Sequence, residues 1–177
     1  MQLAESIKLS IRDVPDFPRP GIIFKDITPL LEKPRLVKDV VRAMVEQNRQ
    51  LQVDAVAAIE ARGFLFGFLL AQEMNVPFIP VRKEGKLPYR KLVQSYTLEY
   101  GSASIEMHED AVQEGWKVII HDDLLATGGT ANAAGQLIER LGGEVAGFNF
   151  IVNLSFLGGA DLLKKQYSRE PRFLIKY

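Results

Sequence analysis

VIIHDDLLATGGT, residues 118–130, is the stretch of this 177-residue sequence that decides the fold. Its three β-branched residues, Val118 to Ile120, are typical of a buried strand in a parallel sheet. Asp122 and Asp123 follow, so we expect the strand to deliver two carboxylates to its carboxyl end. Beyond the loop, apolar residues recur at the spacing of one helix face, at Ala131, Ala134, Leu137, Ile138 and Leu141.

The loop between this strand and this helix consists of small residues: Ala126, Thr127, Gly128, Gly129 and Thr130. The first N–H groups of a helix have no partner inside it, and the helix dipole adds partial positive charge there. Glycines let the backbone approach an oxygen cluster, and threonine hydroxyls add donors. We therefore predict a phosphate at the loop. The two acids would repel a phosphate but suit hydroxyls or a metal ion, so a phosphorylated sugar satisfies both parts.

The alternative for this stretch is a plain turn, capped by Thr127, with both acids solvated at a strand end. A Gly-Gly turn alone favours that interpretation. The complete order of strand, acid pair, loop and helix favours the sugar phosphate.

A second unit of strand, loop and helix comes earlier in the chain. Ala55 to Ile59 predicts a short buried strand, and Arg62 and Gly63 open the following helix. This loop is a second candidate anion site, although Glu60 and Arg62 alone are also typical of a local ion pair. A basic run from Arg82 to Lys91 is either a solvated loop or a cationic partner for phosphates.

Two further segments predict loops or hairpins near a site. Residues 96–107 alternate in polarity around Gly101, which predicts a β-hairpin. We expect this hairpin to form a lid over an active site. Pro18 and Pro20 stiffen the segment before Ile22 to Phe24. We expect these apolar residues in a surface loop, where they either plug the core or offer a flat wall to a base.

Composition narrows the class of protein. Twenty-two basic and twenty-two acidic residues give a formal net charge of zero, so the sequence predicts neither nucleic-acid nor membrane binding. No cysteine is present, which excludes disulfides and a cysteine nucleophile. Residues 1–10 lack the apolar core of a signal peptide, and no apolar run reaches the length of a membrane span. We expect a cytoplasmic protein.

Residues 118–130 resemble the phosphoribosyl-pyrophosphate (PRPP) motif of type I phosphoribosyltransferases. Three further segments resemble the adenine phosphoribosyltransferases among them: FPRPGIIFKD at 17–26, EARGFLFG at 60–67, and RKEGKLP at 82–88 with SYTLEYG at 95–101. The resemblance implies an α/β fold with a central, mainly parallel sheet, flanking helices and a β-hairpin hood. It implies one domain over residues 1–177, with base binding in 1–30 and the hood in 83–107.

The resemblance also implies a reaction, in which the 5-phosphoribosyl group of PRPP passes to adenine, giving AMP and pyrophosphate in purine salvage. Mg²⁺ would be the cofactor, held mainly by the pyrophosphate of PRPP rather than by protein ligands, and the protein would be a homodimer in which Arg82 reaches across. The implied site residues are catalytic Glu99, Asp122 and Asp123; phosphate-binding Ala126, Thr127, Gly128, Gly129 and Thr130; pyrophosphate-binding Arg62, Gly63, Arg82, Lys83 and Lys86; and adenine-binding Ile23, Phe24 and Lys25.

Two alternative functions remain open at this point. The first is an enzyme of the same scaffold that uses hypoxanthine, guanine or xanthine, because residues 17–26 favour adenine only by resemblance. The second is a PRPP-sensing regulator of transcription or RNA. The absence of a strongly basic balance and of a helix-turn-helix extension disfavours the regulator.

Overall fold

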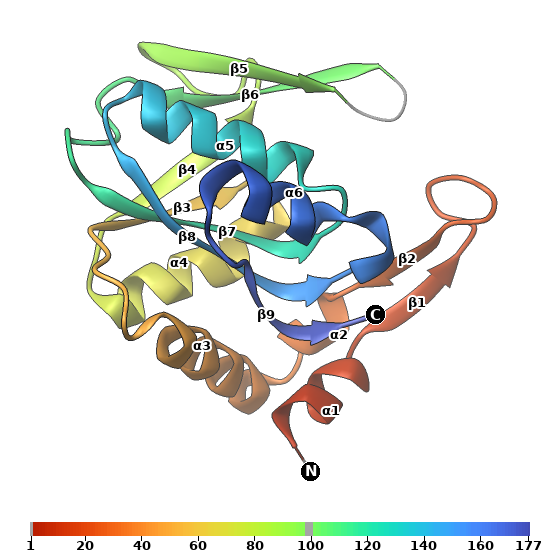
Figure 1. Cartoon of the computed structure of the whole chain (residues 1–177). Coiled ribbons are helices and arrows are strands. Elements are labelled where there is room, and N and C mark those ends of the chain that lie inside the picture. The colour runs from red at the N-terminus through yellow and green to blue at the C-terminus, as the bar shows by residue number, and fades with distance from the viewer. Residues whose placement is uncertain (1, 98–100) are drawn as a thin grey trace.

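The computed structural model describes residues 2–97 and 101–177. A seven-stranded sheet in the order β5-β6-β4-β3-β7-β8-β9 runs through the molecule (Figure 1). Five strands run parallel: β3 (Ala55–Ile59), β4 (Phe78–Lys83), β7 (Lys117–Leu125), β8 (Glu144–Asn153) and β9 (Arg172–Lys176). β5 (Lys91–Thr97) and β6 (Ser102–His108) form an antiparallel hairpin that joins the edge at β4. The predicted α/β class and mainly parallel sheet are confirmed.

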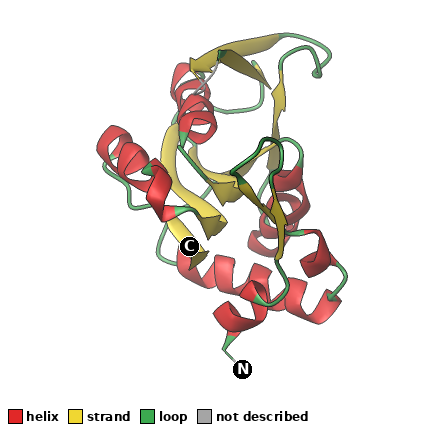
Figure 2. Ribbon diagram, turned by 90° about the vertical axis from the view of Figure 1, so that its right-hand side faces the viewer, coloured by secondary structure: helices red, strands yellow, loops and turns green. Residues whose placement is uncertain are grey.

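Helices cover both faces of this sheet (Figure 2). One face carries α5 (Gly129–Arg140) and α6 (Gly159–Tyr167), and the other carries α3 (Pro34–Asn48) and α4 (Arg62–Met74). The shorter elements are α1 (Leu3–Lys8), α2 (Thr28–Leu31) and the 3₁₀ turn η1 (Ser155–Leu157). No helix within residues 2–97 and 101–177 is long and apolar enough to cross a membrane.

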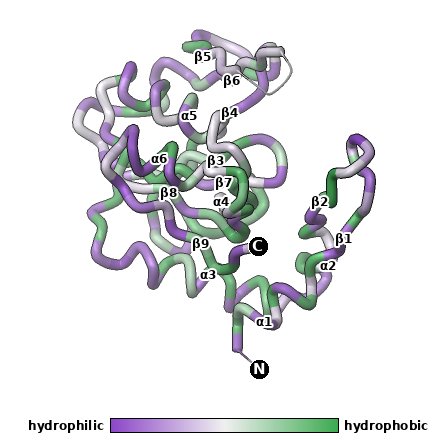
Figure 3. The backbone as a smooth tube through the Cα atoms, turned by 45° about the vertical axis from the view of Figure 1, so that its right-hand side comes forward, coloured by the Kyte–Doolittle hydropathy of each residue, from purple (hydrophilic) through white to green (hydrophobic). Residues whose placement is uncertain are grey.

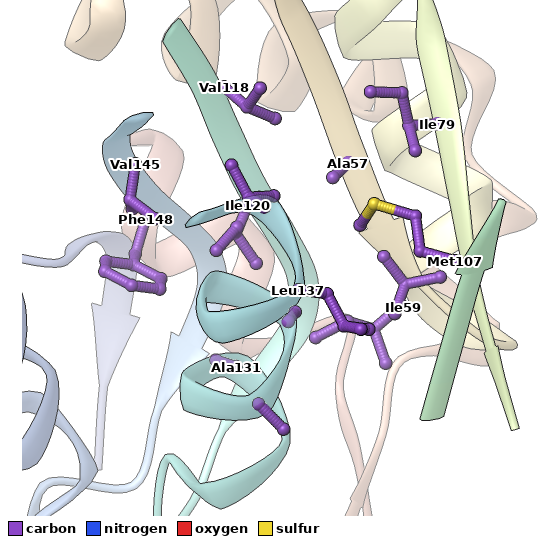
Figure 4. Close-up of a cluster of buried hydrophobic side chains, with 14 of the residues drawn as sticks. Ala57, Ile59, Ile79, Met107, Val118, Ile120, Ala131, Leu137, Val145 and Phe148 are labelled. Carbon is purple, nitrogen blue, oxygen red and sulfur yellow. The ribbon is translucent and has the colours of Figure 1, made fainter. Parts of the chain in front are cut away.

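The core divides between the two faces because side chains alternate along each strand. In β3, Ala55 and Ala57 pack toward α5, whereas Val56 packs toward α3 and α4. Ile120 of β7 and Leu137 of α5 belong to the same buried cluster, which Figure 4 shows in close-up, and both side chains are fully buried. Burying one such aliphatic side chain stabilises the fold by about 1.5–3 kcal/mol. The β-branched run that predicted a buried strand therefore forms the centre of the molecule.

A small second sheet pairs β1 (Arg12–Pro15) with β2 (Ile23–Asp26) in antiparallel register. Figure 3 shows this hairpin standing away from the central sheet. The prediction of a surface loop at Ile22 to Phe24 is wrong in part, because β2 begins at Ile23. The prolines occupy the turn between the strands, and β1 supplies the partner that sequence periodicity could not identify.

Strand β7 is longer than its apolar run predicts. Asp122 and Asp123 lie within the strand rather than after it, because β8 continues the pairing to Leu125 and Asn153. The backbone of both acids is therefore extended. Their side chains have different surroundings, because successive side chains of a strand point to opposite faces of the sheet.

Candidate active site

A cavity of about 150 Å³ lies where the carboxyl ends of β3, β4 and β7 meet. An adjacent hollow of about 80 Å³ follows the loop after β7, and Asp122 and Thr130 line both. The carboxyl edge is where parallel α/β sheets bind their ligands. The larger cavity is lined by Ile59, Glu60, Val81, Lys83, Tyr96, Ile105, Asp122 and Thr130.

The loop from Ala126 to Thr130 has the geometry predicted for a phosphate site. Helix α5 begins at Gly129, and its N-cap is Gly128, which has a φ of +82° and makes no side-chain cap. Glycine adopts this left-handed conformation without the steric cost that a Cβ would bring. Thr127 does not cap the helix, so the alternative of a plain turn capped by Thr127 is wrong on this point. The first N–H groups of α5 are therefore left for a ligand that accepts hydrogen bonds.

The two acids have different surroundings. Asp122 lines the cavity and accepts a hydrogen bond from the Asp123 backbone N–H at 2.8 Å. Asp123 is only 3% exposed, and its Oδ2 lies 3.1 Å from Nε of Arg62. Burial raises the pKa of Asp122, and the neighbouring Asp123 carboxylate raises it further. Burial also raises the pKa of Asp123, whereas Arg62 opposes that shift. Asp122 therefore lines the cavity, whereas Asp123 is buried behind it.

Arg62 joins the acid pair to the small hairpin. Besides Asp123, its guanidinium donates to the backbone carbonyl of Lys25 at 3.4 Å and lies 4.7 Å from the centre of the Phe24 ring. The proposed local ion pair between Glu60 and Arg62 is absent from the ion pairs of the described residues, because each side chain has another partner. Arg62 therefore lies between the predicted sugar and base sites.

Arg82 is the partner of Glu60. Two of its nitrogens donate to the Glu60 carboxylate at 3.0 and 3.2 Å, and Nη1 donates to the carbonyl of Lys86 at 2.8 Å. The Lys83 N–H also donates to Glu60. Hydrogen bonding from Arg82 lowers the pKa of Glu60 against the effect of burial. This network fixes the end of β4, where Lys83 enters the cavity.

Glu106 is a charged residue of this region to which sequence analysis assigned no role. It is fully buried, and its carboxylate accepts the backbone N–H groups of Gly85, Lys86 and Leu87 and pairs with Lys91 at 3.2 Å. Burial would raise its pKa, but these donors lower it overall. The only signal in the sequence is an acid between two apolar strand residues, and its partners lie about twenty residues earlier.

Comparison with known proteins identifies the family of this chain. A family model described as the phosphoribosyl transferase domain matches residues 26–168. The adenine phosphoribosyltransferase of Cytophaga hutchinsonii is 52% identical over 175 residues, which cover 99% of this chain and 96% of that protein. This chain belongs to the adenine phosphoribosyltransferase family.

Two crystal structures of adenine phosphoribosyltransferases resemble the whole chain. The enzyme from Thermoanaerobacter pseudethanolicus is 48% identical with a TM-score of 0.94, and covers 99% of this chain and 100% of that one. The Saccharomyces cerevisiae enzyme, complexed with D-2,5-dideoxy-2,5-imino-altritol 1,6-bisphosphate and adenine, is 38% identical with a TM-score of 0.89 over 98% of each chain. The type I phosphoribosyltransferase fold predicted from the motifs is confirmed.

The segment that binds adenine by resemblance to this family lies on β2. Ile23 is 56% exposed, and Phe24 is half-buried with its ring edge-to-face against Phe17 at 5.1 Å. The ammonium of Lys25 turns to Asp13, at 2.7 Å, on the neighbouring strand. An apolar surface and the β2 backbone are thus available to a base. Glu99, predicted to face adenine and the ribose, lies outside the described residues.

Gly63, predicted to bind pyrophosphate, lies against the acid pair. A Cβ at Gly63 would lie 2.8 Å from Oδ1 of Asp122 and 3.2 Å from the carbonyl of His121. Because the strand backbone cannot yield, Gly63→Ala should displace Asp122 and lower kcat by about tenfold, as small misplacements in a reacting site do. Initial rates with adenine and PRPP measure this. Gly147→Ala, whose Cβ would meet only the flexible end of Leu51, is the control. An unchanged kcat in Gly63→Ala would contradict this placement.

His121 precedes the acid pair in β7 and is fully buried. Burial lowers its pKa from 6.5 to about 4, and neighbouring Asn149 opposes this shift only in part. Since the folded-state pKa is the lower one, the neutral imidazole favours the folded state above about pH 6.5. This contribution is lost as the pH falls from about 6.5 toward 4, and amounts to about 3 kcal/mol.

We therefore expect the free energy of unfolding of the wild type to fall by about 3 kcal/mol more than that of His121→Gln between about pH 7 and about pH 4. Urea unfolding at each pH measures both. The raised pKa values of Asp122 and Asp123 favour the fold as pH falls, but they act in both proteins and cancel in the difference. Parallel pH profiles for the two proteins would contradict a buried neutral His121.

Proposed function

We propose that this protein transfers the 5-phosphoribosyl group of PRPP to adenine, releasing pyrophosphate and forming AMP. The observation that carries the proposal is the junction of the 150 Å³ cavity with the hollow over residues 124–131, which meet at Asp122 and Thr130. A ribose in the cavity would extend its 5-phosphate to the N-terminus of α5. The pyrophosphate of PRPP would lie toward Lys83, and the reacting carbon of the ribose would face the β2 hairpin.

Different residues would serve different parts of the reaction. Adenine attacks C1 of the ribose while the bond to pyrophosphate breaks, so positive charge develops on the sugar. The Asp122 carboxylate would grip the ribose hydroxyls and stabilise that charge, with Asp123 acting beside it through Arg62. The loop from Ala126 to Thr130 would fix the 5-phosphate and hence the position of C1.

The leaving pyrophosphate requires cations. We assign its binding to the groups around the end of β4 and the start of α4: Arg62, Gly63, Arg82, Lys83 and Lys86. Lys83 lines the cavity, which supports its assignment. Arg62 and Arg82 have carboxylate partners in the same chain, so their part in pyrophosphate binding requires an exchange of partners. The same exchange would let Arg82 reach a neighbouring subunit.

We propose that Mg²⁺ binds together with PRPP. Magnesium is usually held by substrate phosphates, waters and one or two carboxylates, and Asp122 supplies a carboxylate at the cavity wall. Among the described residues, no three acidic or histidine side chains are grouped as a metal site. When bound, Mg²⁺ would neutralise charge on the pyrophosphate.

Glu99 is proposed to manage the proton that the purine ring loses. Glu99→Gln should therefore lower kcat by about a hundredfold, a typical effect for a general base, and leave the dissociation constant of PRPP within about twofold. Initial rates and PRPP titration measure the two quantities. Equal losses in both would show that Glu99 orients the substrate instead.

We also propose a cytoplasmic homodimer of single-domain chains, with residues 1–30 serving the base and residues 83–107 forming the hood. Exposed apolar residues of α4, Leu65, Phe68 and Leu69, support a partner surface. A hollow of about 570 Å³ between α3 and α4 adjoins Leu69. Burial of such a patch is what a second copy would achieve. Sedimentation at several protein concentrations tests the dimer.

The test of the reaction offers PRPP and Mg²⁺ with adenine, hypoxanthine, guanine and xanthine separately, and follows pyrophosphate release. We expect turnover with adenine alone. Turnover with an oxopurine would keep the scaffold and overturn the choice of base. PRPP binding without turnover on any base would favour the regulatory alternative.

A further inference from the structure

The Lys25 side chain has an unusual position for a residue of a projecting hairpin. Its side chain is only 12% exposed, and its ammonium pairs with Asp13 at 2.7 Å. The same ammonium lies 4.1 Å from the centre of the Tyr177 ring, and the Lys8 ammonium lies 5.5 Å from that ring. A cation over an aromatic face at such a distance is attracted by the ring quadrupole, more strongly as water is excluded.

Tyr177 is itself firmly anchored to the central sheet. Its N–H donates to the carbonyl of Asn153 at 2.9 Å, and its carbonyl accepts the N–H of Ser155 at 3.0 Å and the Ser155 hydroxyl. The ring packs against the core cluster beneath α3 and α4. Tyr177 thus connects the end of β8 to a side chain of β2, two elements that no strand pairing joins.

Lys25 is held on its other side as well. Its backbone carbonyl accepts Nη1 of Arg62, and Arg62 pairs with Asp123. The β2 backbone is therefore fixed between the acid pair and Tyr177. Because the Lys25 ammonium already contacts Tyr177 and Asp13, Lys25 would contact a base through its backbone rather than through its side chain.

We propose that Tyr177 is a positioning residue for adenine, which holds the Lys25 ammonium and so sets the β2 backbone against the base. This inference rests on the proposed function. The aromatic face performs this task, and the phenol hydroxyl is dispensable. Lys25 acts on adenine through its backbone, and its side chain acts as the anchor.

The test compares Tyr177→Leu, Tyr177→Phe, Lys25→Met and the double variant Tyr177→Leu with Lys25→Met in the adenine and PRPP assay. We expect Tyr177→Leu to raise the KM for adenine by about tenfold, within the range of a desolvated cation–π contact, and to leave the KM for PRPP within about twofold. Tyr177→Phe keeps the ring and should match the wild type within about twofold. Lys25→Met loses the ion pair with Asp13 as well as the ring contact, so its KM for adenine should rise at least as much as that of Tyr177→Leu. The double variant should match Lys25→Met, because the contact between the ammonium and the ring is already lost in that variant.

Amide hydrogen exchange of residues 23–26 gives a second readout that needs no turnover. We expect faster exchange there in Tyr177→Leu and unchanged exchange in Tyr177→Phe. An unchanged adenine KM in Tyr177→Leu, an equal rise in both KM values, or a Tyr177→Phe variant as impaired as Tyr177→Leu would each overturn the inference. Failure of the wild type to use adenine would overturn the proposed function, whereas failure of the inference leaves wild-type turnover intact.

Discussion

Replacing Asp122 and Asp123 together by asparagine is expected to lower kcat by about a thousandfold, because the cationic sugar loses its carboxylate stabilisation. The fold should remain intact. Both acids have a raised pKa, so their ionised forms cost stability near neutral pH, and neutral amides remove that cost. We expect a melting temperature equal to or above that of the wild type.

The single variants separate the two acids. Asp122 lines the cavity, whereas Asp123 acts through Arg62, so Asp122→Asn should lose more turnover than Asp123→Asn. Asp110→Asn, at an exposed position, is the control and should behave as the wild type. Initial rates and thermal unfolding measure these variants. A double variant that unfolds, or one that keeps substantial turnover, would contradict the assignment of the acids.

Glu106→Gln is expected to produce the largest loss of stability. The amide that replaces one carboxylate oxygen would face backbone N–H donors that need an acceptor, and Lys91 would lose its partner. Breaking such a buried charged network costs about 3–5 kcal/mol, which corresponds to a fall of about 6–15 °C in melting temperature for a chain of this size.

The same variant should also weaken PRPP binding. Glu106 holds the backbone of residues 85–87, which include Lys86, one of the residues assigned to pyrophosphate. We therefore expect the KM for PRPP to rise by about tenfold while that for adenine changes little. Glu109→Gln, at an exposed position in the turn directly after β6, is the control. A Glu106→Gln protein with wild-type stability would contradict the buried network.

The sequence predicted those parts of the fold that depend on local pattern. The β-branched run at Val118, the strand Ala55–Ile59 and the helix that carries Ala131 to Ile138 lie where the sequence pattern placed them. The loop from Ala126 to Thr130 was predictable too, since a strand, a glycine pair and a helix follow one another without interruption. In each case the determining residues are neighbours in the chain.

The parts that sequence analysis placed wrongly or overlooked depend on partners far apart in the chain. Strand β7 passes the acid pair because β8 continues beside it, and β2 is a strand because β1 pairs with it. Arg62 binds Asp123 rather than nearby Glu60, and Glu106 binds amides about twenty residues earlier. No periodicity in one segment carries these pairings, because they arise only when the sheet assembles.

A crystal structure of the protein with bound AMP tests the proposed active site most directly. We expect the phosphate against the backbone of residues 126–130, the ribose hydroxyls at Asp122 and the adenine against Ile23 to Lys25. A phosphate bound instead at Lys83 and Lys86, or an adenine remote from the β2 hairpin, would contradict it.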